Sequence, residues 1–474
     1  MSDLLRDFAA AVARHPDRVA LVDGKGRAVT YHELDARRMR FASAWQRKGI
    51  GAGDRVLLAM TVDADLYAAL AALWTIGAMA VLPEPAMGLA GLRHAARATR
   101  PRAFCTSGLY GLLRWVLPEL WGLRHLRPEQ RAVPPPGMVP PAGRDIALIS
   151  FTSGTTGAPK AIARSHDFLA AQHNAIEPLL HSAQPERDLV AFPVFVLINI
   201  ASGQTSVLPN WKMSRLDRLN PAQLRDWMQR NRVTRALIPP SLCEMLVQAG
   251  GNAPLHTVFT GGGPVFPELI DRMQAARPDL GVCCVYGSTE AEPIAHLDAT
   301  EITGDDRKAM DEGQGLLVGY PVAGIRLRID KDEIQVAGAH VNCGYLEPAH
   351  DAENKIRDGA TVWHRTGDAG RLDAQGRLWL LGRMGTDVKI GGRMRYPFAV
   401  EVAARQWPGV RQCALMAAQD AACLVIEGDK AQAAVWQRHV ADLGIDRVLH
   451  VPAIPMDKRH RSKIDRKSLC ALLN

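Results

Sequence analysis

The sequence predicts an α/β protein with a large N-terminal region, in which parallel-rich sheets are covered by helices, and a smaller C-terminal α+β unit. Three observations support this fold class. Strand and helix patterns alternate to about residue 300, hairpin-like strands follow, and the last ~90 residues contain a separate set of short elements. With 474 residues, the chain is long enough for two or three compact units.

The N-terminal region alternates helical and strand patterns. Apolar residues recur at helical spacing up to Pro16, and a short apolar strand follows at residues 19–22. Residues 28–60 indicate a strand, a helix, a glycine turn and another strand, and residues 66–85 indicate a helix and a buried strand. Such alternation is typical of a mostly parallel sheet covered by helices.

Short strands joined by tight turns follow. Residues 325–338 and 369–385 each contain two strand patterns around a turn, which predicts hairpins in a β-rich part. The last part of the chain contains two helical patterns, two strands and a basic tail, with these elements at residues 396–407, 413–419, 422–428 and 431–444.

Composition and charge exclude several classes of protein. The chain is 47% hydrophobic and 22% charged, which is ordinary for a globular protein. Its net charge of +8 is spread without a block, so we expect no nucleic-acid partner. We expect no signal peptide, because the N-terminal residues carry charges throughout, and no membrane span, because no apolar run approaches ~18 residues. The eight cysteines form no CxxC pair, which argues against a zinc site, and we expect a cytoplasmic location with reduced thiols.

A glycine- and hydroxyl-rich segment, "ISFTSGTTGAPKAIARSH", occupies residues 149–166. Its spacing differs from a Walker A loop, but its glycines allow backbone N–H groups to approach a phosphate, its hydroxyls donate hydrogen bonds, and its lysine supplies a cation. A flexible linker would rarely follow a buried strand. We therefore predict a phosphate-binding loop that consists of Thr152, Ser153, Gly154, Thr155, Thr156, Gly157 and Lys160.

This loop and four later motifs resemble those of the adenylate-forming superfamily, which includes acyl-CoA synthetases, luciferases and the adenylation domains of peptide synthetases. The later motifs are "TGGGPV", "VYGSTEAEP", "HRTGDAGRLDAQGRLWLLGR" and "KRHRSKIDRKSL", at residues 260–265, 285–293, 364–383 and 458–469. They follow the order of the family and span nearly the whole chain, so jointly they are specific.

The resemblance implies a role for each motif. Tyr286 is expected to stack on adenine, Asp368 to bind both ribose hydroxyls, and Glu290 to hold Mg²⁺. The catalytic residues implied are Thr289, Glu290, Arg383 and Lys463. The nucleotide-binding residues implied, besides the loop above, are Gly261, Gly262, Gly263, Tyr286, Gly287, Ser288, Asp368 and Arg383.

These residue types suit the attack of a carboxylate on the α-phosphate of ATP. Negative charge builds on phosphate oxygens, which cations and N–H donors stabilise, and a carboxylate is a hard ligand for Mg²⁺. Each residue alone has an ordinary alternative. Asp368 could form a turn, Lys463 could belong to a solvated basic tail, and Tyr286 could pack in the core. The joint order of the motifs favours the functional interpretation.

The resemblance also implies a mobile C-terminal domain. The predicted domains are residues 1–383, which bind AMP and the acyl group, and residues 384–474, a lid that carries the catalytic lysine. The hinge position is usually charged in the family but is Gly385 here, and glycine tolerates the required change in φ and ψ. Gly391 and Gly392 lie in a segment that resembles the wall of the family's thiol tunnel.

We predict an enzyme that uses ATP and Mg²⁺ to activate a carboxylic acid as acyl-AMP, with release of pyrophosphate. The next step would transfer the acyl group to the thiol of CoA or of the phosphopantetheine on an acyl carrier protein, as in an acid–thiol ligase. The apolar, uncharged residues 191–209 favour a fatty or other apolar acid over an amino acid.

Two alternatives stay open. The "FP-x-F" and "GQTSVLP" segments and the "D-x-RH-x-x-KI" tail are similar to the olefin-pathway β-lactone synthetases, which would cyclise a 3-hydroxy fatty acid without a thiol. A non-catalytic nucleotide-binding homologue is the alternative from another class. The presence of Lys463 and Glu290 argues against it.

Overall fold

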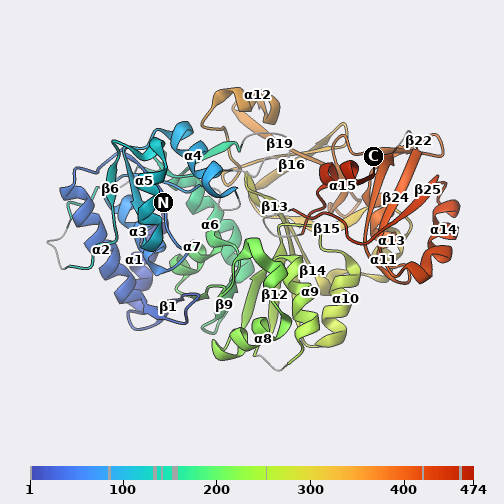
Figure 1. The fold of residues 1–474 in the computed structure, drawn as a ribbon, viewed down its shortest axis with the longest axis horizontal. Helices are drawn as coiled ribbons and strands as arrows, with labels where there is room; N and C mark the ends of the chain where they lie inside the picture. The colour runs from blue at the N-terminus through green and yellow to red at the C-terminus, as the bar shows by residue number, and fades with distance from the viewer. Residues whose placement is uncertain are drawn as a thin grey trace.

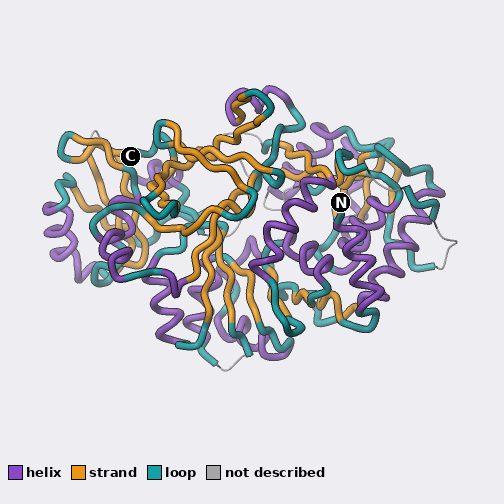
Figure 2. Tube along the Cα trace, turned by 180° about the vertical axis from the view of Figure 1, so that it is seen from behind, coloured by secondary structure: helices purple, strands orange, loops and turns teal. Residues whose placement is uncertain are grey.

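The computed structural model contains two large sheets, a small C-terminal sheet and the helices around them (Figure 1, Figure 2). The described residues are 3–83, 87–131, 136–139, 142–151, 159–251, 254–418, 421–457 and 462–473. Figure 1 shows the N-terminal elements at one end of the molecule and the C-terminal elements at the other, with the second large sheet between them.

In the part of the chain that the structure describes, the first sheet has six strands in the order β6-β5-β3-β4-β7-β8, of which only β8 is antiparallel to its neighbour. Its strands are β3 (Arg55–Ala59), β4 (Met79–Val81), β5 (Ala103–Thr106), β6 (Arg124–Leu126), β7 (Ile146–Phe151) and β8 (Ala161–Ser165). The helices of this region are α1 (Leu4–Arg14), α2 (Tyr31–Arg47), α3 (Ala64–Thr75), α4 (Gly88–Thr99) and α5 (Leu113–Val116). Helix α2 begins at a capping box formed by Thr30 and Glu33.

Within the described residues the second sheet has fourteen strands, and six neighbouring strands of it are parallel. The parallel strands are β1 (Val19–Val22), β9 (Arg187–Val190), β10 (Thr205–Val207), β11 (Arg235–Ile238), β12 (Thr257–Gly261) and β13 (Gly281–Ser288). The antiparallel strands are β2 (Ala28–Thr30), β14 (Ala291–Asp298), β15 (Leu316–Pro321), β16 (Ile325–Asp330), β17 (Glu333–Gly338), β18 (Lys355–Asp358), β19 (Thr361–Leu372) and β20 (Leu378–Arg383).

Prolines start four successive helices beside the parallel strands. A proline is favoured at the first helical position because its fixed φ suits the helix and its missing N–H would have no partner there. These helices are α7 (Pro193–Ser202), α8 (Pro221–Arg230), α9 (Pro240–Ala249) and α10 (Pro267–Ala276). Others are α6 (His166–Leu180), α11 (Gly304–Asp311) and α12 (Asp351–Asn354). Helix α6 contacts β8 of the first sheet and β14 of the second, and so joins the two sheets.

The C-terminal part forms a three-stranded sheet in the order β23-β24-β25, with a separate hairpin. Two apolar clusters, around Trp436 and around Leu469, pack against this sheet. The elements are β21 (Val388–Ile390), β22 (Arg393–Arg395), α13 (Phe398–Ala404), β23 (Val410–Ala418), β24 (Ala421–Gly428), α14 (Ala433–Asp442), β25 (Arg447–Val451) and α15 (Arg466–Leu473).

The structure confirms the predicted α/β class, including the parallel-rich sheets and the two hairpins at residues 325–338 and 369–385. The β-rich part is the antiparallel continuation of the second sheet. The sequence predicts only a basic tail after the last helical pattern, but the structure contains strand β25 and helix α15 in that segment. The domain boundary at residue 383 stays a prediction.

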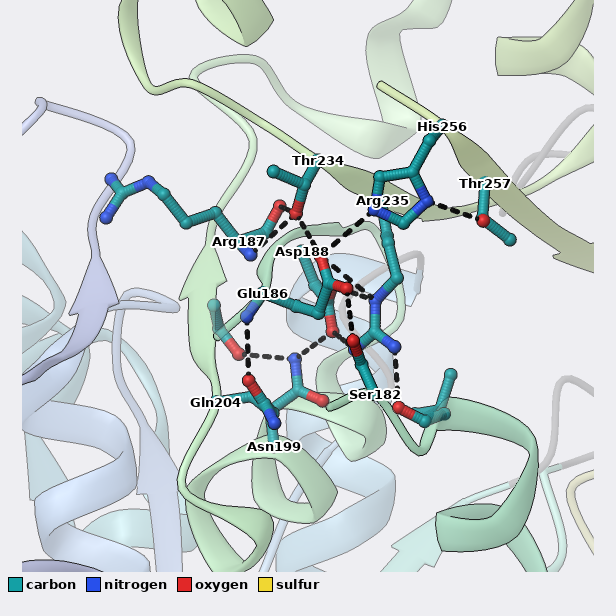
Figure 3. Close-up of polar contacts among 12 residues, drawn as sticks. Ser182, Glu186, Arg187, Asp188, Asn199, Gln204, Thr234, Arg235, His256 and Thr257 are labelled. Carbon is teal, nitrogen blue, oxygen red and sulfur yellow. Dashed lines mark hydrogen bonds and ion pairs between the residues drawn. The ribbon is translucent and has the colours of Figure 1, made fainter. Parts of the chain in front are cut away.

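A buried ionic cluster joins strands at the amino end of the parallel sheet (Figure 3). Arg235 at the start of β11 donates two hydrogen bonds to the Asp188 carboxylate on β9, at 2.8 and 2.9 Å, and Asn199 donates a third at 2.9 Å. Glu186 accepts hydrogen bonds from Ser182 and Thr234, at 2.6 and 2.5 Å. This ionic cluster therefore fixes the end of the sheet opposite to the predicted site.

Candidate active site

The predicted glycine segment lies at the carboxyl end of β12, where ligands commonly bind in parallel sheets. A side chain at Gly261 would collide with the carbonyl oxygen of Val285 on the neighbouring strand. Gly262 has φ of 79°, a left-handed conformation that favours glycine. Backbone approach and backbone conformation therefore account for glycine at both positions.

Tyr286, Asp368 and Arg383 come together from three strands. The Tyr286 hydroxyl donates a hydrogen bond to Asp368 Oδ2 at 2.8 Å, and Arg383 Nη1 donates one to Asp368 Oδ1 at 2.8 Å. Burial, with the Asp368 carboxylate beside it, raises the pKa of the Tyr286 hydroxyl well above its ordinary value, so the hydroxyl stays a donor. Asp368 lies within β19, so it is more than a turn-forming residue.

Thr289 and Glu290 form the turn between β13 and β14, and two other segments hold it. Arg164 Nη2 on β8 donates a hydrogen bond to the Thr289 carbonyl at 2.7 Å, and the Asn342 N–H donates one to the Glu290 carbonyl at 2.7 Å. A side chain at Gly287 would lie 3.0 Å from the Ala291 carbonyl oxygen. The turn is therefore fixed to both large sheets.

A polar atom at the end of β13 is suited to contact a ligand. The Ser288 hydroxyl oxygen is buried and makes no hydrogen bond within the described part of the chain. Buried hydroxyls usually have a partner, so a phosphate or ribose oxygen placed here would satisfy it. The donor set around Ser288 and Tyr286 thus fits a nucleotide.

Tyr345 connects Glu290 to two lysines. Its hydroxyl donates a hydrogen bond to Glu290 Oε1 at 2.9 Å, and the ammonium groups of Lys355 and Lys160 lie 5.2 and 5.7 Å from its ring centre. Lys160 also forms an ion pair with Glu353 at 3.3 Å. Burial lowers the pKa of the Lys355 ammonium to about 8, and the nearby Glu290 carboxylate opposes this shift.

Tyr345 and Lys355 are missing from the sequence-based prediction. They are 55 and 65 residues away from Glu290 along the chain, and neither lies in a segment with a chemical signature of its own. Only the pairing of strands brings them together: Tyr345 forms a bridge with Ile162 on β8, immediately after the predicted phosphate loop.

Most of the predicted phosphate loop lies outside the described residues. Strand β7 ends at Phe151 and β8 begins at Ala161, so the predicted strand before the loop is confirmed and Lys160 is placed beside Tyr345. The loop positions outside the described residues are Thr152, Ser153, Gly154, Thr155, Thr156 and Gly157.

The segment that contains Lys463 lies against the glycine segment of β12. A side chain at Gly263 would lie 2.5 Å from Ser462 Cβ, and the Ser462 hydroxyl is 3.5 Å from that of Ser241. The Lys463 N–H donates a hydrogen bond to Asp457 Oδ1 at 2.8 Å. The structure therefore brings Lys463 to the predicted nucleotide region from about 200 residues away along the chain.

An apolar pocket opens beside the glycine segment of β12. Its empty volume is about 460 Å³, and part of this volume is open to solvent. Its wall comes from α6, α7 and the ends of β11 to β14 and includes Phe192, Phe195 and Phe259. Gly261, Gly262 and Val285 line it too, so the pocket adjoins the candidate nucleotide residues. Its position suits the acyl part of a substrate.

A family model described as "AMP-binding enzyme" matches residues 8–346 of the chain. This match covers well over half of the sequence. The chain belongs to the AMP-binding, adenylate-forming enzyme family. The family assignment agrees with the order of the motifs and with the geometry of Tyr286, Asp368 and Arg383.

Several members of the family are similar over nearly their whole length. The chain is 31% identical to an olefin beta-lactone synthetase of Stenotrophomonas maltophilia, over 93% of this chain and 90% of the relative. It is 29% identical to an olefin beta-lactone synthetase of Xanthomonas campestris, over 98% and 97%. It is 24% identical to 4-coumarate-CoA ligase 1 of Narcissus pseudonarcissus, over 96% and 91%.

Solved structures of the family share the fold. The amide bond synthetase McbA from Marinactinospora thermotolerans superposes with a TM-score of 0.80 at 22% identity, covering 99% of both chains. The anthranilate CoA ligase AuaEII superposes with a TM-score of 0.83 at 17% identity, covering 100% of this chain and 97% of the other. Within the described part of this chain, no helix is long and apolar enough to cross a membrane.

Proposed function

We propose that this adenylate-forming enzyme activates an apolar carboxylic acid with ATP and Mg²⁺, and forms acyl-AMP and pyrophosphate. The observation that carries the proposal is the packing of Ser462 against Gly263. It brings the Lys463 segment to the strand ends where Tyr286 and Asp368 meet. A nucleotide-binding protein without catalytic activity would not need this arrangement.

The proposed nucleotide site is built on hydrogen bonds that the chain already makes. Tyr286 and the segment Gly261 to Gly263 would hold the adenine, and Asp368 would accept hydrogen bonds from the ribose hydroxyls. Its two carboxylate oxygens accept hydrogen bonds from Tyr286 and Arg383, so those two donors orient the carboxylate for the sugar. The loop that ends at Lys160, with Thr289, would bind the phosphates.

Glu290 fits a Mg²⁺ ion that is held mainly by the substrate. Mg²⁺ is commonly bound by one or two carboxylates together with phosphate oxygens and water. Tyr345 orients the Glu290 carboxylate, and Lys160 lies close to the same tyrosine, so a carboxylate and a cation face the proposed phosphate region together. The ion would neutralise phosphate charge during the attack.

The Lys463 ammonium would stabilise the charge that develops on the α-phosphate as the carboxylate attacks. A lysine is a compact point charge, which suits a transient contact with oxygens of both reactants. In this proposal residues 384–474 form the C-terminal domain that delivers Lys463, and Gly385, at φ of 74°, is its hinge.

We further propose that a 3-hydroxy fatty acid is the substrate and that its hydroxyl captures the acyl group. The hydroxyl oxygen attacks the acyl carbonyl carbon, the bond between this carbon and the AMP oxygen breaks, and AMP leaves while the hydroxyl proton is released. The product is a β-lactone. Support comes from the two relatives named as olefin beta-lactone synthetases and from the apolar pocket.

Transfer to the thiol of CoA or of an acyl carrier protein is the second candidate. It is favoured by the similarity to 4-coumarate-CoA ligase 1 and by the β21–β22 hairpin, where Gly391 and Gly392 have φ of 55° and 81°. The open backbone at these glycines would let a pantetheine arm approach closely.

ATP–pyrophosphate exchange with fatty, 3-hydroxy fatty, aryl and amino acids tests the proposal, with products identified by mass spectrometry with and without CoA. Exchange with 3-hydroxy fatty acids and a product lighter than the acid by one water would support lactone formation. An acyl-CoA product would support the thiol candidate. Exchange with amino acids alone would contradict the apolar substrate.

A further inference from the structure

A short segment between β5 and β6 exposes several large apolar side chains. It consists of η2 (Gly108–Leu112), helix α5, η3 (Pro118–Leu120) and Trp121, and we call it the exposed apolar segment. Leu109, with an exposed fraction of 86%, is the most exposed large apolar side chain in the described part of the chain. The others exposed in this segment are Tyr110, Leu112, Trp115, Val116 and Trp121. Single exposed apolar residues are normal, but such a concentration indicates a surface that binds a partner.

The segment is anchored to the first sheet by its remaining leucines. Leu117 and Leu120 are buried in an apolar cluster that includes Phe104 on β5. η3 contacts α4, and the Glu119 carboxylate forms an ion pair with Arg97 on that helix at 2.6 Å. The apolar side chains of the segment are therefore divided between an inner face, which packs on the protein, and an outer face, which meets solvent.

Arginines are concentrated in and beside this segment. Residues 93–131 contain eight arginines and two glutamates, without lysine or aspartate, so they carry a net charge of +6, out of +8 for the whole chain. No two of these arginines are adjacent, so the sequence contains no charged run here. Most of the net positive charge of the chain nevertheless falls within this short stretch.

Two of the arginines lie beside the exposed apolar segment in space. Arg114 Cζ is 4.3 Å from the centre of the Trp115 ring, and a side chain at Gly111 would lie 4.0 Å from Arg127 Nη2. Both charges act on His125, because burial and the charges of Arg127 and Arg114 lower the pKa of its imidazole. Cations and apolar groups are thus combined on one surface.

The surface lies at one end of the molecule. Figure 1 shows α5 among the N-terminal elements, at the opposite end from β24 and the other strands of the C-terminal sheet. The segment begins just after β5, and β5 runs parallel to β7, the strand before the predicted phosphate loop. A partner that binds the segment would therefore approach the molecule at the end remote from the C-terminal sheet.

We propose that the exposed apolar segment binds the surface of a bilayer that contains anionic lipids. Its leucine, valine and tryptophan side chains would enter the boundary between headgroups and acyl chains, where tryptophan is favoured, and the arginines would contact lipid phosphates. A nucleic acid fits less well, because bases stack on aromatic rings and half of the exposed side chains are aliphatic. The proposal goes beyond the proposed function and does not rest on it.

Flotation with lipid vesicles tests the proposal on the full chain. Vesicles of phosphatidylcholine with an equal amount of phosphatidylglycerol are compared with vesicles of phosphatidylcholine alone. We expect the protein to partition to the anionic vesicles and less so as salt is raised, because salt screens exposed charges. Arg114→Gln with Arg127→Gln should lower the partition coefficient on anionic vesicles about tenfold to thirtyfold.

Leucine substitutions test the apolar contact. Leu109→Ser with Leu112→Ser should lower the partition coefficient at least about tenfold, because two apolar side chains no longer enter the bilayer. The matched control is Leu372→Ser with Leu472→Ser, which replaces two exposed leucines outside the segment and should leave the coefficient unchanged. Urea unfolding of both variants verifies that they fold, as expected for substitutions of exposed side chains.

Several outcomes would overturn the proposal. They are equal partition to the two kinds of vesicle, no partition of the wild-type protein, or partition that Leu109→Ser with Leu112→Ser retains. Light scattering without lipid adds another, namely a wild-type dimer that this leucine variant loses, because the segment would then be an interface between copies of the chain. Partition that requires both the arginines and the leucines of the segment, and not the control leucines, supports the proposal.

Discussion

At the scale of single residues, Tyr345 is the contact that links the proposed metal ligand to the proposed phosphate loop. Its hydroxyl donates to Glu290 Oε1, while its ring faces Lys160 and Lys355. The hydroxyl contact can be separated from the ring contacts, because phenylalanine at this position keeps the ring and removes the hydroxyl. Glu290 would then lose the donor that fixes its carboxylate.

We predict that Tyr345→Phe raises the Mg²⁺ concentration needed for half-maximal pyrophosphate exchange about tenfold, as for one hydrogen bond to a charged group. ATP binding without Mg²⁺, measured by calorimetry, should stay the same. Tyr320→Phe is the control, because Tyr320 is exposed on β15. An unchanged Mg²⁺ dependence in Tyr345→Phe would show that the hydroxyl does not position Glu290.

His364 is buried on β19. Burial, with the Lys355 charge nearby, lowers the pKa of its imidazole to about 4. The unfolded chain takes up this proton near pH 6.5, so acid favours the unfolded state between these two values. Through His364 alone, lowering the pH from 7 to 5 should reduce the free energy of unfolding by about 2 kcal/mol.

His364→Asn should remove this part of the pH dependence, since an amide can still donate to the Asn354 carbonyl, which lies 3.2 Å from His364 Nδ1. Urea unfolding at pH 7 and pH 5 measures it. His32→Asn, at an exposed position on α2, is the control. Equal pH dependence in wild-type and His364→Asn would contradict the assignment.

At the scale of elements, the ionic cluster at the amino end of the parallel sheet joins β9 to β11 (Figure 3). We predict that Arg235→Met lowers the free energy of unfolding by about 3–5 kcal/mol, because the Asp188 carboxylate stays buried without its cation. Denaturant unfolding measures this loss.

The double variant Arg235→Met with Asp188→Leu should recover part of that stability, since the Asp188 carboxylate is removed together with its cation. Glu186, which lies 4.0 Å from Arg235, keeps its hydrogen bonds from Ser182 and Thr234, and Asn199 keeps one to Ser206 at 3.1 Å. ATP affinity should be unchanged in the double variant, because the candidate site lies at the other end of the strands. A double variant that is as unstable as Arg235→Met would contradict the ionic explanation.

Elements with a strong local pattern could be predicted from the sequence. The strand Val19–Val22 and the hairpin of β16 and β17 occur as the periodicity and turn residues indicate. The β25 strand and the α15 helix were not predicted, because a tail rich in charge has little apolar periodicity and both elements form by packing on β23 and β24.

The candidate site could be predicted only in part, for the same reason. Asp368 and Glu290 lie in motifs with a recognisable chemistry, but the contacts that orient them come from distant strands. No spacing in the sequence pairs Tyr345 with Glu290, and none places Glu292 in the pocket, because these contacts depend on strand order and register. The roles of the site residues stay predictions.

At the scale of the whole molecule, the C-terminal part contacts β15 and β20 through α13, and its Lys463 segment contacts Gly263 just beyond β12. We predict that Gly263→Ala slows adenylation by about tenfold to a hundredfold, because a new Cβ would displace the Lys463 segment and a shift of 1 Å at a reacting group has such an effect. Pyrophosphate exchange measures this rate.

The matched control is Gly304→Ala, since no atom lies within 4 Å of a Cβ at Gly304. Combining Gly263→Ala with Ser462→Gly should restore part of the rate, because the Ser462 side chain is one of the groups in the way. A normal rate in Gly263→Ala alone would show that this contact is not needed for adenylation.

The contact between Ser462 and Gly263 has a consequence for the timing of the proposed reaction. A thiol acceptor has to enter after adenylation, so the C-terminal part would have to move away while the reactive acyl-AMP waits. A hydroxyl that belongs to the substrate is present from the start. The lactone could then form while the C-terminal part stays closed over the site, where acyl-AMP is shielded from hydrolysis. The C-terminal part would open once per turnover and release the lactone and AMP together.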